Sequence, residues 1–80
     1  MAVKSKLRQL REGLGNPKVS QEAIARKVGI SLQWYRQLES GEQQNTSYTT
    51  ANAIIRAFNA ERELRNQEVV AIDEIGLNIV

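Results

Sequence analysis

Between residues 21 and 40, the apolar positions repeat with the spacing of two short helices joined by a tight turn. The five apolar anchors are Ile24, Val28, Ile30, Tyr35 and Leu38. A small residue, Ala25, stands where the two helices must cross closely, and Gly29 stands where the chain must turn. This combination predicts a helix-turn-helix, the motif whose second helix is built to enter the major groove of DNA.

The same spacing predicts helices on both sides of this motif. An amphipathic helix is expected over residues 3–14 from the apolar positions Val3, Leu7, Leu10 and Leu14. It is ended by the turn-forming residues Gly13, Gly15, Asn16 and Pro17. Within the motif, Ser20 and Ser31 are predicted to cap the two helices, and Gly29 and Gly41 to end them.

After a polar loop over residues 42–47, a helical stretch is predicted from Thr49 or Thr50 to about Arg65. It forms either one helix or two shorter helices broken at Asn59. The side chains expected to face inward are Ile54, Ile55, Phe58 and Leu64.

The remaining tail, residues 67–80, is too apolar for a solvated terminus. Its apolar residues are Val69, Val70, Ile72, Ile75, Leu77, Ile79 and Val80. Two conformations stay open. β-Branched side chains favour an extended segment, whereas Asp73, Glu74 and Gly76 would instead mark one short helical turn between two extended pieces. Two roles stay open. The tail either helps to build a two-fold interface with a second copy, or it folds back over the bundle of its own chain.

Composition excludes several kinds of chemistry. Eighty residues make one small domain, which we divide into a DNA-binding part at residues 1–66 and the tail at residues 67–80. The chain has no cysteine, no histidine and a single aspartate, Asp73. Disulfide, zinc and general-base chemistry therefore lack their residues, and we expect no enzyme activity, metal or cofactor.

No apolar run approaches the roughly 18 residues that span a bilayer. The N-terminal residues MAVKSKLRQL lack the apolar core of a secretory signal. We therefore expect a cytoplasmic protein with no membrane partner.

Charge is divided unevenly along the chain. Residues 1–41 hold eight basic and three acidic side chains, a net +5, whereas residues 42–80 hold three basic and six acidic side chains, a net −3. A basic half beside an acidic half predicts one face for phosphates and another face for a different contact.

Geometry alone assigns the residues that would face DNA. Because Tyr35 and Leu38 must point into the core, the opposite side of the second motif helix, residues 31–40, carries Leu32, Gln33, Arg36, Gln37 and Ser40. Glutamine pairs well with adenine, arginine with guanine, and leucine with a thymine methyl group. The predicted base contacts are Leu32, Gln33, Arg36 and Gln37.

The run from Lys6 to about Ala60 resembles the phage repressor and Cro-type helix-turn-helix domains, also called XRE-like. The resemblance is carried by LRQLRE, SQEAIARKVGIS and WYRQLESGE, followed by a capped apolar helix from Thr49. It implies an all-α, lambda-repressor-like bundle of about five helices. It further implies sequence-specific binding of double-stranded DNA, usually by a homodimer on a palindromic operator. The loop GLGNPKV is longer than the family's turn, and the tail after Arg65 matches no family helix.

The resemblance also assigns residues outside the base contacts. Gln21 would hold a phosphate, and the loop after the second motif helix would touch the DNA backbone through Gln43, Gln44 and Asn45. Ser20, Trp34 and Ser40 are further candidates for backbone contact, although Ser20 also suits a cap and Trp34 also suits packing. Arg11 and Glu39 would form a partly buried ion pair.

Three interpretations of function follow. The leading one is a transcriptional regulator, a repressor, that binds operator DNA. The second is the antitoxin of a toxin–antitoxin pair, which would bind DNA and a protein partner through its C-terminal region. The third is a protein-interaction module that has kept the fold and lost DNA binding, against which the row of Gln33, Arg36 and Gln37 argues.

Overall fold

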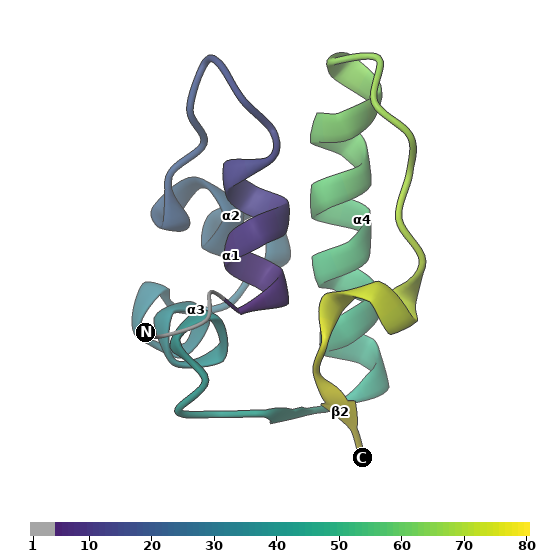
Figure 1. Ribbon diagram of the computed structural model, residues 1–80. Helices are drawn as coiled ribbons and strands as arrows, with labels where there is room; N and C mark the ends of the chain where they lie inside the picture. The colour runs from purple at the N-terminus through teal and green to yellow at the C-terminus, as the bar shows by residue number, and fades with distance from the viewer. Residues whose placement is uncertain (1–4) are drawn as a thin grey trace.

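The structure is a computed structural model that describes residues 5–80 (Figure 1). Its elements are α1 (Lys6–Glu12), α2 (Gln21–Val28), α3 (Leu32–Ser40), β1 (Asn45–Thr46), α4 (Tyr48–Leu64), the 3-10 turn η1 (Ile72–Ile75) and β2 (Asn78–Ile79). The predicted all-α helix-turn-helix bundle is confirmed, with four α-helices and one 3-10 turn within residues 5–80.

A serine caps the start of each α-helix. The hydroxyl oxygens of Ser5, Ser20, Ser31 and Ser47 each accept a hydrogen bond from the amide three residues later, at 3.0–3.1 Å. Each bond satisfies a backbone donor that the first turn leaves free. The predicted caps at Ser20 and Ser31 are therefore confirmed. The cap at Ser47 starts α4 slightly earlier than predicted.

The first helix is shorter than predicted. It begins at Lys6 and ends at Glu12, and Val3 lies outside the described residues. Leu14 follows the helix and is buried in the core. Its apolar side chain therefore indicates a core position, and it does not show that the helix extends to residue 14.

The fourth helix is unbroken, so the alternative of a break at Asn59 is wrong. The Asn59 amide instead donates to the Val70 carbonyl at 3.1 Å and accepts from the Val70 amide at 2.8 Å. A side chain that can mimic a peptide group thus binds the tail without disturbing the helix. The expectation that Leu64 faces inward is also wrong. It is 77 % exposed, because it is the last residue of α4, where the chain turns away.

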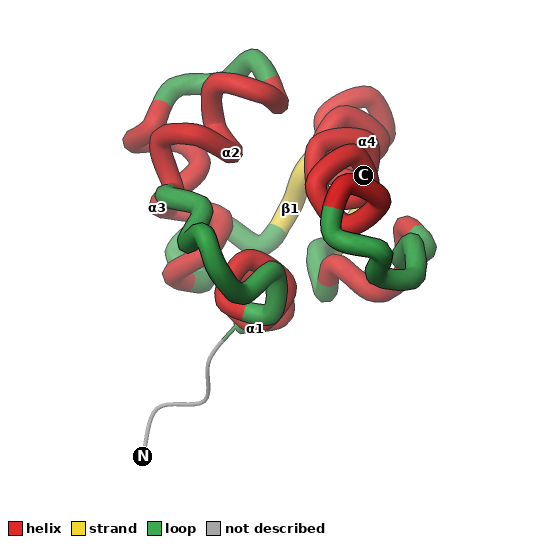
Figure 2. The backbone as a smooth tube through the Cα atoms, turned by 90° about the horizontal axis from the view of Figure 1, so that it is seen from above, coloured by secondary structure: helices red, strands yellow, loops and turns green. Residues whose placement is uncertain are grey.

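One hydrophobic core joins every helix to the tail. Its residues are Leu7, Leu14, Val19, Ile24, Ala25, Tyr35, Leu38, Ala51, Ile54, Ile55, Phe58 and Ile75. The helix α4 contacts α2 and η1, and α1 contacts α3 and η1. Figure 2 shows α4 on one side of the molecule and α1–α3 on the other, with β1 in the connection between them.

The tail folds back on its own chain. Of the two conformations left open by the sequence, the tail takes the one with a short helical turn, and this 3-10 turn buries Ile75 in the core, at 1 % exposure. Beyond Gly76, β2 pairs in parallel with β1, where the Asn78 amide donates to the Gln44 carbonyl at 2.8 Å. Residues 42–47 are therefore not only a loop, as predicted, because they contain one strand of this pair.

Candidate nucleic-acid interface

The third helix presents a polar face beside a buried one. Tyr35 and Leu38 are 0 % and 1 % exposed and anchor α3 in the core. On the other side Gln33, Arg36 and Ser40 are exposed. Leu32 and Gln37 are half-buried at the edge of this face. A protruding helix with free amide and guanidinium groups has the shape and chemistry that enter a major groove.

Trp34 lies between these two faces. It is half-buried and packs against the core cluster, so packing is its observed contact.

The start of α2 lies beside α3. The Ser20 hydroxyl caps α2, while the Gln21 side-chain amide donates to Glu39 Oε1 at 3.1 Å. The N-terminus of α2 carries free backbone amides and the positive end of the helix dipole, which together suit a phosphate. Gln21 thus ties this anion-attracting end to the last turn of α3.

The ion pair between Arg11 and Glu39 holds three elements together. Arg11 Nη2 lies 2.7 Å from Glu39 Oε1, and Arg11 Nε lies 3.0 Å from Oε2. The remaining Arg11 Nη1 donates to the Val19 carbonyl at 3.1 Å. The two side chains are 18 % and 2 % exposed. A planar fork that binds both carboxylate oxygens suits such a site, and it fixes α1, α3 and the residue before Ser20.

Electrostatics at this pair favour the charged forms. Burial by itself raises the pKa of the Glu39 carboxyl, but the hydrogen bonds and the charge of Arg11 outweigh it, so that this pKa lies below its usual value. The hydrogen bond to Glu39 also raises the pKa of Arg11. Burial raises the pKa of the neighbouring Tyr35, and the Glu39 charge raises it further.

A cleft of about 380 Å³ opens where these elements meet. It is lined by Arg8, Arg11, Gln21, Arg36, Glu39 and Ser40. Arg36 makes no hydrogen bond or ion pair with any residue among 5–80, and its guanidinium is available to a ligand. The cleft therefore joins the polar face of α3 to the N-terminus of α2 with excess positive charge.

The loop after α3 is ordered by its own bonds. The Gln43 amide donates to the Gln37 carbonyl at 3.0 Å, and the Gln43 side chain accepts from the Asn45 amide at 3.3 Å. The Gln44 side chain donates to the Gly41 carbonyl at 3.4 Å. Gln44 and Asn45 are exposed, whereas Gln43 is half-buried. The three candidates for backbone contact thus lie on a segment fixed next to α3.

Comparison with known proteins decides the family. A family model described as a helix-turn-helix domain matches residues 5–67, most of the chain. The chain belongs to this helix-turn-helix family. Membership agrees with the resemblance to phage repressors and supports DNA as the partner, and domains of this family are typically not enzymes. A search of curated proteins and a search of solved structures each found no match.

Two further findings concern alternatives to DNA binding. Across residues 5–80, no helix has the length and apolar character needed to cross a membrane. The same residues contain no group of three or more His, Cys, Asp or Glu side chains placed to hold a metal ion.

The contribution of Arg8 to the cleft was not predicted from the sequence. Arg8 precedes Arg11 by three residues, so both side chains lie on one face of α1. That spacing was the available signal. The cluster in which Glu61 of α4 pairs with Lys27 of α2 and with Arg65, at 2.9 Å, was also not predicted. Lys27 and Glu61 are 34 residues apart, so no local pattern links them. The i, i+4 spacing of Glu61 and Arg65, by contrast, was an available signal.

Acid is expected to destabilise the protein through Glu39 and Glu61. The hydrogen bond from Lys27 lowers the pKa of Glu61, and the pKa of Glu39 is also lowered. Both carboxylates therefore stabilise the fold above the unfolded-state value of about 4.3, and this contribution is lost as pH falls through the lower folded-state values. Urea unfolding from pH 7 to pH 2.5 should show stability falling below about pH 5.

The matched control for this acid sensitivity removes both charges of the Arg11–Glu39 ion pair together. In the double variant Arg11→Met with Glu39→Leu, stability should fall less steeply with acid than in the natural chain. An identical fall in both proteins would show that the Arg11–Glu39 pair does not carry the acid sensitivity.

Proposed function

We propose that this protein is a sequence-specific regulator of transcription, a repressor, that binds double-stranded DNA with α3 in the major groove. The observation that carries the proposal is the continuity between the exposed polar face of α3 and the basic cleft at the start of α2. One side of the motif offers base-reading groups and the adjoining side offers phosphate-binding groups.

Base reading would come from four side chains of α3. The amides of Gln33 and Gln37 suit adenine, Arg36 suits guanine, and Leu32 suits a thymine methyl group. Backbone contacts would surround them and fix the register without reading sequence. The proposed backbone residues are Ser20, Gln21, Trp34, Ser40, Gln43, Gln44 and Asn45.

The division of charge supports this orientation. The net +5 of residues 1–41 includes α1, α2 and α3, whereas the net −3 of residues 42–80 includes α4 and the tail. Because α4 stands on the other side of the molecule (Figure 2), the basic half can approach phosphates while the acidic half points elsewhere.

A homodimer on a palindromic operator is part of the proposal. One helix-turn-helix reads a short half-site, and two copies bind half-sites about 34–36 Å apart. The apolar residues that the tail leaves exposed are Val69, Ile79 and Val80, and they are the proposed two-fold contact. A protein that regulates operator DNA acts where that DNA is, which we propose is the cytoplasm.

The test is base reading by Gln33 and Gln37. After selection of a preferred site from random duplexes, Gln33→Ala and Gln37→Ala should each weaken binding to that site by about 1–3 kcal/mol. Both variants should bind a random duplex as the natural protein does. Gln21→Ala is the contrasting variant, because loss of a phosphate contact weakens both duplexes alike. Equal losses on both duplexes for the Gln33 and Gln37 variants would contradict base reading by α3.

An antitoxin role is the second candidate. The exposed Val69 and Val80 favour contact with a protein through the C-terminal region. Burial of Ile75 in the chain's own core leaves less of the tail for such a partner than the sequence suggests. Coexpression with a toxin-like protein encoded next to this chain would separate the two roles, because a repressor needs no such partner.

A further inference from the structure

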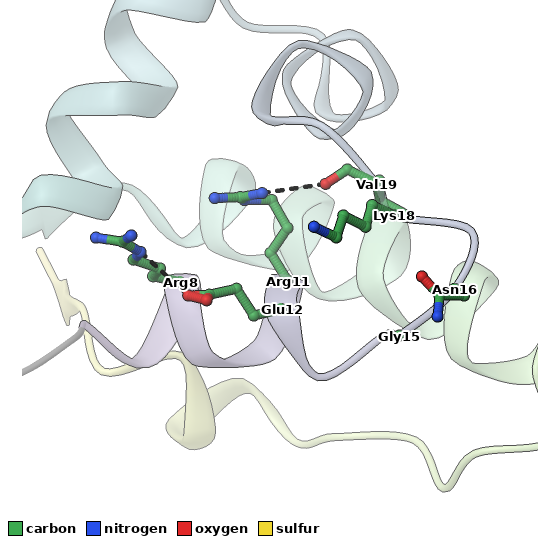
Figure 3. A pocket seen from close by; sticks show the side chains of 7 residues that line it. All are labelled: Arg8, Arg11, Glu12, Gly15, Asn16, Lys18 and Val19. Carbon is green, nitrogen blue, oxygen red and sulfur yellow. Dashed lines mark hydrogen bonds and ion pairs between the residues drawn. The ribbon is translucent and has the colours of Figure 1, made fainter.

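A second cavity lies between α1 and the loop at residues 13–18 (Figure 3). Its volume is about 390 Å³. Three basic side chains line it, Arg8 and Arg11 from α1 and Lys18 from the loop, against one acidic side chain, Glu12. Its lining therefore has a net positive charge.

Lys18 is the basic residue of this cavity whose ammonium group has no partner among residues 5–80. Arg11 is committed to Glu39 and the Val19 carbonyl, and Arg8 pairs with Glu12 at 3.1 Å in an exposed contact of small energy. Lys18, by contrast, makes no hydrogen bond or ion pair within the described chain. Its side chain extends from the loop into the cavity toward α1, as Figure 3 shows. An unpaired ammonium group in a positive cavity attracts an oxyanion.

The loop that forms the wall is held in place from the far end of α4. The Arg65 guanidinium donates to the Leu14 carbonyl at 3.1 Å and to the Pro17 carbonyl at 2.7 Å. The Gln67 side-chain amide donates to the Gly13 carbonyl at 3.3 Å. The same Gln67 amide also donates to the Leu14 carbonyl at 3.3 Å. A wall fixed by four side-chain bonds loses little further freedom when a ligand binds, which favours affinity.

The cavity and the cleft beside α3 share two lining side chains. Arg8 and Arg11 line both spaces, so cationic side chains run from Lys18 across α1 to Arg36. We propose that the cavity between α1 and residues 13–18 binds a phosphate group through Lys18, with the Asn16 side chain as an additional donor. This phosphate belongs either to the DNA backbone or to a free phosphorylated ligand. The first assignment rests on the proposed function, and the second does not.

The test compares Lys18→Gln with Arg56→Gln in the full chain. Arg56 is an exposed cation on α4 that makes no ion pair among residues 5–80, so the control removes the same charge elsewhere. If a DNA phosphate occupies the cavity, Lys18→Gln removes one phosphate contact. Loss of affinity between 50 mM and 200 mM salt should then be about 3.5-fold smaller than in the control, equally on preferred and random duplexes.

A second arm uses inorganic phosphate without DNA. Titration followed by NMR should shift the backbone amides of residues 15, 16 and 18 in the natural protein and in Arg56→Gln, but not in Lys18→Gln. Shifts abolished by Lys18→Gln with an unchanged salt dependence assign the site to a free ligand. No effect of Lys18→Gln in either arm would overturn the phosphate site. DNA binding is tested separately, by whether Gln33→Ala loses its preference for the selected duplex over a random one.

Discussion

Replacing Arg11 with methionine is expected to lower the free energy of unfolding by about 3–5 kcal/mol. The substitution leaves the Glu39 carboxylate buried, at 2 % exposure, with only the Gln21 amide as a remaining donor among its side-chain bonds. It also frees the Val19 carbonyl from its bond to Arg11. A small domain of 80 residues lies at the low end of the usual stability, roughly 0.05 kcal/mol per residue or about 4 kcal/mol in total. A loss of this size should therefore leave a large part of the protein unfolded at ordinary temperature.

Thermal melting followed by circular dichroism measures this effect. The matched control is Arg8→Met on the same helix, whose ion pair with Glu12 is 54 % and 37 % exposed and should contribute less than about 1 kcal/mol. The double variant Arg11→Met with Glu39→Leu should recover much of the loss, because no charge is left unpaired. A melting curve of Arg11→Met that matches the natural protein would contradict the structural role of the pair.

The tail should be required for the fold. Ile75 is 1 % exposed in the core, and Ile75→Ala is expected to cost about 2–5 kcal/mol through lost burial and the cavity that remains. Deletion of residues 67–80 removes that side chain, the Gln67 bonds to the loop and the β1–β2 pair together. The truncated chain should therefore fail to fold, whereas a tail used only as an interface would leave a folded monomer.

Urea unfolding of Ile75→Ala, with Val80→Ala as the control, separates these outcomes. Val80 is 83 % exposed, and its truncation should change stability by less than about 0.5 kcal/mol. A folded truncated chain, or equal stability of the two point variants, would show that the tail is not part of the core.

The local features of this protein could be predicted from its sequence. Ser20, Gly29, Ser31 and Gly41 define both ends of α2 and α3, because capping and left-handed turns depend on a few neighbouring residues. The inward direction of Tyr35 and Leu38 then determines which side chains of α3 are exposed, and burial agrees with that assignment for Gln33 and Arg36.

The contacts between distant segments could not be predicted. Asn59 looked like a helix breaker because its polar amide is unfavourable in an isolated helix, but Val70 supplies both of its hydrogen-bond partners. Likewise, the pattern around Lys18 showed a long loop without showing that Arg65 holds it beside α1. Such partners are separated by many residues, and no local periodicity reports them.

The parallel pairing of Asn45 with Asn78 sets an order of folding. All of α4 and η1 lie between these two strands in the sequence, so the pair can form only after a long loop has closed, and it contributes few hydrogen bonds to offset that entropy. The helices, whose bonds are local, form without it. The amides of Asn78 and Val80, which donate to β1 and its flank, should consequently exchange with solvent deuterium through partial opening of the tail, well before the amides of α4 do.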